Sequence, residues 1–172
     1  MKRIIFILCT AGLLAACNTN NPEPEELNEI QKIGRELATF LTDNYTEGDS
    51  IYLTTESGDK EGFIVYENHY SEIRISSVKD GSLSDVQYCI IETKLRNAEN
   101  TLRVIIKVLR ERAGISVWGE IYTQPRDSLH HGTLTQSDSE VRIETEDGRL
   151  CILQKNKGIV SISTKDGKSW KL

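Results

Sequence analysis

The chain has few of the features that mark nucleic-acid-binding proteins or membrane-spanning proteins. Its 21 Lys and Arg residues are outnumbered by 26 Asp and Glu residues, and aromatic residues make up only 6% of the 172 residues. A net charge of −5, without a basic stripe that carries stacking aromatics, argues against nucleic acid as a partner. After Leu14 no apolar run is long enough to cross a bilayer as a helix, which takes about 20 residues.

Motifs that identify a reaction are also missing. There is no Gly-x-Ser-x-Gly elbow, no His-Glu-x-x-His motif, no phosphate-binding glycine loop and no Ca²⁺ loop. His130 and His131 are adjacent in a loop without further ligands at metal-binding spacing, and His69 falls in an expected turn. We therefore predict no metal, no cofactor and no enzymatic activity. The alternative is an unrecognised hydrolase, for which Glu92 and Glu120 would form a carboxylate pair.

The clearest motif lies at the N-terminus. Lys2 and Arg3 precede an apolar run, residues 4–14, and small residues follow, which is the order of a secretory signal peptide. The segment Leu14-Ala15-Ala16-Cys17 resembles the lipobox of bacterial lipoproteins, in which a diacylglycerol is attached to the cysteine sulfur. The resemblance implies that residues 1–16 are removed and that Cys17 anchors the protein to a membrane through several acyl chains.

The residues after the lipobox predict where the protein is anchored. Asn18 stands where Asp often marks retention at the inner membrane in lipoproteins, so the outer membrane of the cell envelope is favoured. Glu23, Glu25 and Glu26 resemble the acidic export signal of Bacteroidetes surface lipoproteins. They equally suit the first turn of a helix, because the positive end of its dipole favours acids.

We predict that residues 17–24 form a short lipidated tether. Residues 25–172 are long enough to form a single domain with one core. The domain is expected to begin with an amphipathic helix that ends before Gly48. Its apolar stripe recurs at steps of three and four residues: Leu27, Ile30, Ile33, Leu37, Phe40 and Leu41. This helix either binds a partner or packs on the domain's own sheet.

After Gly48 the apolar and polar residues alternate with the period of a β-strand. Asp-Gly pairs at residues 80–81, 147–148 and 166–167 indicate hairpins, and such short connections require antiparallel strands. We predict about nine or ten strands. The expected fold is α+β and mainly β, with an N-terminal amphipathic helix followed by an antiparallel meander. The meander closes into a small barrel or forms a two-layer sandwich.

Three central strands can be aligned residue by residue. A loop at Asn97–Asn100 places Cys89 opposite Val108, and a second loop at Glu111–Gly114 places Val117 beside Val108. One face of this three-stranded unit is then apolar. The other, which we call the mixed face, interleaves aromatic and charged side chains. Its candidate binding residues are Tyr88, Lys94, Arg103, Lys107, Trp118, Glu120 and Tyr122.

The mixed face has two interpretations at this point. It binds a glycan, a peptide or an envelope protein, or it is the face that the N-terminal helix covers. The first interpretation makes the chain a non-enzymatic binding or accessory lipoprotein. The alternative function is an inhibitor or structural subunit of an envelope complex, which would use a hairpin tip such as residues 127–132.

Two cysteines remain in the mature domain, in a compartment where disulfides form. Cys89 lies on the apolar face of its strand. In the hairpin around Asp147-Gly148, Val141 and Ile143 are expected on one face and Cys151 on the other. A Cys89–Cys151 disulfide and two free thiols therefore both remain open.

Overall fold

The computed structural model describes residues 28–79, 82–111, 114–123 and 131–172, so the signal peptide and tether expected from the sequence lie outside it. Ten antiparallel strands close into a barrel in the order β1-β10-β9-β8-β7-β6-β5-β4-β3-β2. The mainly β prediction is confirmed, and the barrel is selected over the sandwich. The strands are β1 (Ser50–Thr55), β2 (Lys60–Lys79), β3 (Ser82–Arg96), β4 (Thr101–Glu111), β5 (Gly114–Tyr122), β6 (His131–Gln136), β7 (Glu140–Thr145), β8 (Leu150–Gln154), β9 (Gly158–Ser163) and β10 (Ser169–Lys171).

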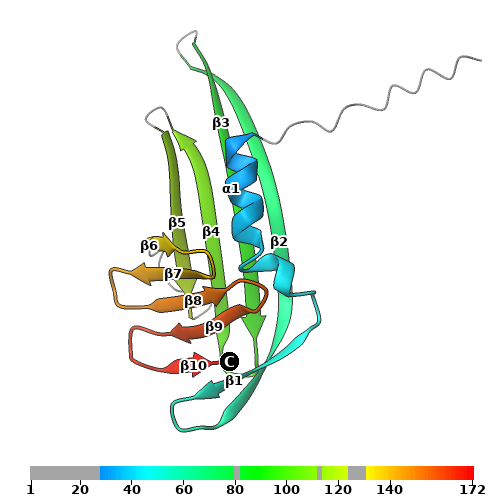
Figure 1. Ribbon diagram of the computed structural model, residues 1–172, viewed down its shortest axis with the longest axis vertical. Coiled ribbons are helices and arrows are strands. Elements are labelled where there is room, and N and C mark those ends of the chain that lie inside the picture. Colours follow the sequence, from blue (N-terminus) through cyan, green and yellow to red (C-terminus); the bar gives the residue numbers. More distant parts are fainter. Residues whose placement is uncertain (1–27, 80–81, 112–113, 124–130) are drawn as a thin grey trace, which may run out of the picture.

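The strands differ in length, and this gives the barrel its shape. β2 to β5 are long and stand side by side, whereas β6 to β10 are short and lie across their lower part (Figure 1). Two junctions between neighbouring strands are narrow. Among the described residues they consist of Thr54↔Lys171 and Thr55↔Trp170 between β1 and β10, and of Gly119↔Gly132 and Glu120↔His131 between β5 and β6.

The helix α1 (Glu29–Ala38) is followed by a 3₁₀ turn, η1 (Thr42–Asn44). Asn28 caps α1, because its side chain accepts a hydrogen bond from the Gln31 backbone N–H and the Gln31 side chain accepts one from the Asn28 N–H. The helix thus begins at Glu29, and the part predicted before Asn28 lies outside the described residues. No helix in the described ranges is long and apolar enough to cross a membrane.

The position of α1 excludes one of the two interpretations of the mixed face, namely that the helix covers it. Ile30 and Leu37 are buried in the same core as the inward side chains of β3 and β4, and the helix packs on these strands. Gly34 permits a close approach, since a Cβ atom there would lie 2.9 Å from Sγ and 3.1 Å from Cβ of Cys89. The helix therefore covers the apolar face, inside the curve of the long strands (Figure 1), and does not cover the mixed face.

The register predicted for β3, β4 and β5 is confirmed. Cys89 pairs with Val108, and Val108 pairs with Val117. On the other face Lys107 pairs with Trp118, also as predicted. Because side chains alternate along a strand, this register sends the apolar residues inward and leaves the mixed face on the outside of the barrel.

The strand β2 departs from the alternation expected from its sequence. The partners of Val65 and Glu67 are adjacent residues of β3, so Tyr66 is an extra residue in a β-bulge. The bulge moves all later side chains of β2 to the opposite face. Ile73, which would share the face of Val65 without the bulge, therefore lies on the mixed face. His69, expected in a turn, lies in the middle of the strand.

The hairpin between β7 and β8 corrects the prediction for Cys151. The Thr145 N–H donates to the Arg149 carbonyl at 3.0 Å, which leaves a three-residue loop that ends in Gly148 at φ 89°. This changes the register by one residue, so Cys151 pairs with Ile143 and is fully buried in the core.

The structure contains two free thiols rather than a Cys89–Cys151 disulfide. Cys89 and Cys151 are both buried and both free, so the disulfide left open by the sequence is not formed. Burial raises the pKa of each thiol above its ordinary value. Both cysteines therefore act as small apolar groups of the core.

Candidate functional site

The mixed face is the outer surface of the long strands, and its side chains form four rows that run across them. From the upper end in Figure 1 the rows are Ile73–Tyr88–Leu109–Ser116, Ser71–Ile90–Lys107–Trp118, His69–Glu92–Ile105–Glu120–His131 and Glu67–Lys94–Arg103–Tyr122. All the candidate binding residues predicted from the sequence lie in these rows. The first row is uncharged and the lower three carry the charges.

One cluster on this face is built around Glu120. The side chain of Glu120 lies on the outer face of the barrel, yet it is 0% exposed because its neighbours cover it. It accepts hydrogen bonds from Lys107 Nζ at 2.7 Å, Trp118 Nε1 at 3.2 Å and Tyr122 OH at 3.1 Å. Burial alone would raise the pKa of the Glu120 carboxyl, but these donors, Lys107 foremost, hold the pKa below its ordinary value. Glu120 is therefore ionised and fixes three neighbouring side chains.

The aromatic members of the Glu120 cluster are held at their polar tips. Burial and the nearby carboxylate raise the pKa of Tyr122 to about 12, so its hydroxyl stays protonated and continues to donate. The ring of His131 lies edge-on to that of Trp118, with centroids 6.1 Å apart. Arg103 lies over the Tyr122 ring at 5.2 Å. Trp118 and Tyr122 remain partly exposed in these fixed orientations.

A second cluster is built around Glu92, which is also buried. Its Oε1 accepts a hydrogen bond from Arg103 Nε and lies 3.4 Å from Lys94 Nζ, while its Oε2 lies 3.4 Å from His69 Nε2. Lys94 also donates to Oε2 of Glu67, and this hydrogen bond holds the pKa of Glu67 below its ordinary value. The bulge in β2 is what brings Glu67 and His69 to this cluster.

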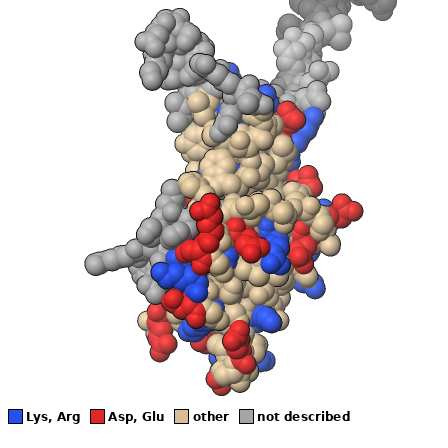
Figure 2. Space-filling view, turned by 90° about the vertical axis from the view of Figure 1, so that its left-hand side faces the viewer, with Lys and Arg blue, Asp and Glu red and all other residues tan. Residues whose placement is uncertain are grey.

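The charges of the two clusters balance. Three carboxylates face three cations: Glu67, Glu92 and Glu120 against Lys94, Arg103 and Lys107. The side of the molecule in Figure 2 shows a similar mixture, with acidic and basic side chains interspersed over the lower part and few charges above. A strongly charged ligand therefore finds no complementary net field on this face.

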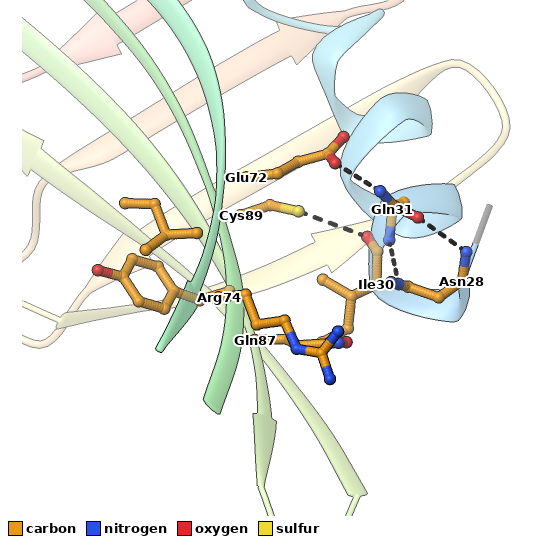
Figure 3. Close-up of a pocket in the computed structure, with 9 residues that line it drawn as sticks. Asn28, Ile30, Gln31, Glu72, Arg74, Gln87 and Cys89 are labelled. Carbon is orange, nitrogen blue, oxygen red and sulfur yellow. Dashed lines mark hydrogen bonds between the residues drawn. The ribbon is translucent and has the colours of Figure 1, made fainter. Parts of the chain in front are cut away.

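A pocket of about 340 Å³ lies between the first turn of α1 and the strands β2 and β3 (Figure 3). Gln31 Nε2 donates to Glu72 Oε2 at 2.6 Å, and Cys89 Sγ lies 3.7 Å from the Ile30 carbonyl. The Cys89 thiol is protonated at neutral pH and is therefore a weak nucleophile. These lining groups hold the helix to the sheet. Of the residues that line the pocket, Ile73 and Tyr88 also belong to the mixed face.

No family model, curated protein or solved structure matches this chain. The site is therefore interpreted from its own residues. The predicted pair Glu92 and Glu120 does flank Ile105, but each carboxylate is bound by cations rather than open to a substrate. His130 and most of the predicted inhibitory loop, residues 127–132, lie outside the described residues.

Sequence reasoning missed Glu67 and His69 as members of the mixed face. The signal that was present is the run Phe63-Ile64-Val65-Tyr66, where four apolar residues in succession interrupt the alternation of β2. Such a run fits a bulge, although it also fits the end of a strand. Only the pairing with β3 decides between them.

Proposed function

We propose that this chain is a lipid-anchored lipoprotein of the bacterial outer membrane, a non-enzymatic accessory module that binds a protein partner through the mixed face. The lipobox that ends at Cys17 supports the anchor. The observation that carries the binding proposal is the Glu120 cluster, in which a buried carboxylate fixes Trp118, Tyr122 and Lys107 on a surface that α1 does not cover.

The residue types favour a protein over a small molecule. Trp, Tyr and Arg are enriched among the few residues that supply most of the binding energy in protein interfaces, and Trp118, Tyr122 and Arg103 lie together here. Side chains that are already fixed lose little conformational entropy on binding. Sites for small molecules are concave, whereas these rows lie on the outer wall of a barrel.

The interior of the barrel supports a non-enzymatic role. The inward side chains of the strands and of α1 form one continuous core of buried residues, which includes Phe63, Ile106 and Trp170. The buried carboxylates of the mixed face, Glu92 and Glu120, are each paired with basic side chains rather than open to a substrate. Both features fit a surface that binds better than one that reacts.

The proposal is tested by site-specific photo-crosslinking in intact source cells. A photoreactive residue at Ser116, on the mixed face, is expected to crosslink to one recurring protein. The same residue at Tyr52, which is 63% exposed on β1, serves as the control and is expected not to. Trp118→Ala should reduce the Ser116 crosslink at least about tenfold, the loss typical of a central interface residue.

The outcomes separate the alternatives. Equal crosslinking from Ser116 and Tyr52, or a Ser116 crosslink unchanged by Trp118→Ala, would refute the mixed face as the binding surface. Trp118-dependent binding to polysaccharide on a glycan array, without a protein crosslink, would replace the protein partner by a glycan. Circular dichroism checks the fold of each variant, and Ser71→Arg adds bulk to the same row as Trp118 if Trp118→Ala does not fold.

A further inference from the structure

The β2–β3 edge of the mixed face holds a group of side chains that the binding proposal does not use. Glu67 and His69 are two residues apart on β2 and so project from the same face. Glu92 pairs directly with His69 across the ladder, at the spacing where opposite side chains meet. Two carboxylates and one imidazole therefore converge on one point of the barrel wall.

The group is compact enough to close around one metal ion. One ligand atom from each of the three residues lies within 4.8 Å of the other two. Glu92 Oε2 lies 3.4 Å from Nε2 of His69, whereas Glu67 Oε1 lies 3.6 Å from Nδ1, so an ion held by one ring nitrogen requires the other carboxylate to turn toward that nitrogen. Ligands bound to zinc at about 2.0–2.2 Å in a tetrahedron are roughly 3.3–3.6 Å apart, so the side chains would draw together by about 1 Å. We propose that Glu67, His69 and Glu92 bind a divalent transition-metal ion of the zinc class.

The neighbouring basic side chains occupy one carboxylate oxygen of Glu67 and one of Glu92, and the other oxygen of each faces the imidazole of His69. Arg103 and Lys94 lie on Oε1 of Glu92, and Lys94 donates to Oε2 of Glu67. Oε2 of Glu92 and Oε1 of Glu67 face His69 instead. Arg103 therefore holds Glu92 through its second oxygen and fixes the orientation of the first, as is common for metal-binding carboxylates. Lys94 Nζ lies beside both carboxylates, where its positive charge competes with a bound cation.

The ligand set selects the class of metal. An imidazole with two carboxylates suits zinc and similar transition metals, whereas Ca²⁺ and Mg²⁺ prefer oxygen ligands alone. The side chains of His69 and Glu67 are 39% and 38% exposed and that of Glu92 is 5% exposed, so the ion would enter from solvent onto a buried floor. A fourth position faces water. Because Lys94 adds a positive charge beside the ion, it lowers the affinity of the site.

Zinc chloride titrated into a chain that begins at Asn18, which retains every described element, tests the proposal by calorimetry. We expect one zinc ion per chain, and a shift of the His69 ring resonances in NMR spectra. His69→Gln and Glu67→Gln should each weaken binding by about a hundredfold or more, since even indirect partners of a metal contribute tenfold to a hundredfold. His131→Gln, which alters the 64% exposed histidine elsewhere on the face, should change nothing.

Removing the positive charge of Lys94 should raise the zinc affinity, in contrast to the ligand substitutions, which should lower it. Lys94→Met removes the competing ammonium and should tighten zinc binding about fivefold, the upper range for one partly exposed charge. Zinc affinity that is unchanged in His69→Gln, or unchanged or weaker in Lys94→Met, would overturn the site. So would the absence of binding at about 1 mM zinc, the weak end of specific affinity. Circular dichroism checks the fold, and Glu67→Gln, at a partly exposed position, is the variant that disturbs it least.

Discussion

Replacing Lys107 by Met should destabilise the protein strongly and in a pH-dependent way. The change keeps the length of the side chain but leaves Glu120, which is 0% exposed, with two neutral donors, Trp118 Nε1 and Tyr122 OH. His131 Nδ1 lies farther away, 3.7 Å from Glu120 Oε1. Removing one partner of a buried ion pair costs about 3–5 kcal/mol. The two remaining hydrogen bonds offset part of this, so we expect the free energy of unfolding at neutral pH to fall by about 2–3 kcal/mol.

The pH dependence has a definite sign. In the native protein the folded pKa of Glu120 is below its ordinary value of 4.5, so its contribution to stability is full above that value and is lost as the pH falls through the folded pKa. In Lys107→Met burial dominates and raises the pKa. Protonation of Glu120 at acid pH then removes the unpaired buried charge from the variant. The difference in free energy of unfolding between the two proteins should therefore narrow as the pH falls.

Urea denaturation at pH 7.5 and at pH 4 measures both effects. The matched control is Arg142→Met, which breaks a pair with Glu144 whose side chains are 44% and 60% exposed and should cost less than about 1 kcal/mol. Lys107→Met/Glu120→Gln should recover part of the lost stability, because the uncompensated charge is gone. The reasoning fails if Lys107→Met costs no more than Arg142→Met, or if its deficit is the same at both pH values.

Three further outcomes follow from the core. Gly34→Ala should gain about 1 kcal/mol of helix propensity but lose about 1–3 kcal/mol by overpacking against Cys89. Thermal unfolding should therefore show a net loss of stability, and a stabilised variant would contradict the close packing of α1 on Cys89. Cys89 and Cys151 should not react with a thiol reagent at pH 8 until urea unfolds the chain, because burial raises the pKa of both thiols. Tyr45→Phe should lose about 1 kcal/mol in urea denaturation, since the Ile159 N–H donates to the Tyr45 hydroxyl at 2.6 Å, and the tyrosine should resist titration up to about pH 12.

The sequence predicted the part of the fold that is set by short loops between apolar strands. The Asn97–Asn100 loop fixed the register of β3 against β4, and with it the composition of most of the mixed face. Two single-residue irregularities could not be predicted. The bulge at Tyr66 and the three-residue loop before Arg149 each change the side-chain phase by one, because the period of a strand is two.

These two irregularities account for the main errors. The bulge brought His69 to Glu92, and the longer loop turned Cys151 into the core. Both are decided by pairing with a distant strand, which a local pattern does not contain. The position of α1 was likewise undecided, because an apolar stripe indicates that a helix packs on something but not on which face of a sheet it packs.

The two narrow junctions of the barrel divide it into halves that are consecutive in the chain. β1 to β5 form one five-stranded sheet and β6 to β10 the other, and within the part of the chain that the structure describes, the ladders of each half are longer than those that join the halves. Amide hydrogens that bond across these two junctions should therefore exchange with solvent through local opening long before global unfolding. The junction of β1 with β10 also joins residues far apart in sequence, so it closes late in folding, after each half has its own local contacts. A chain that lacked its last strand would expose the edges of β1 and β9, and Trp170 would no longer close the core.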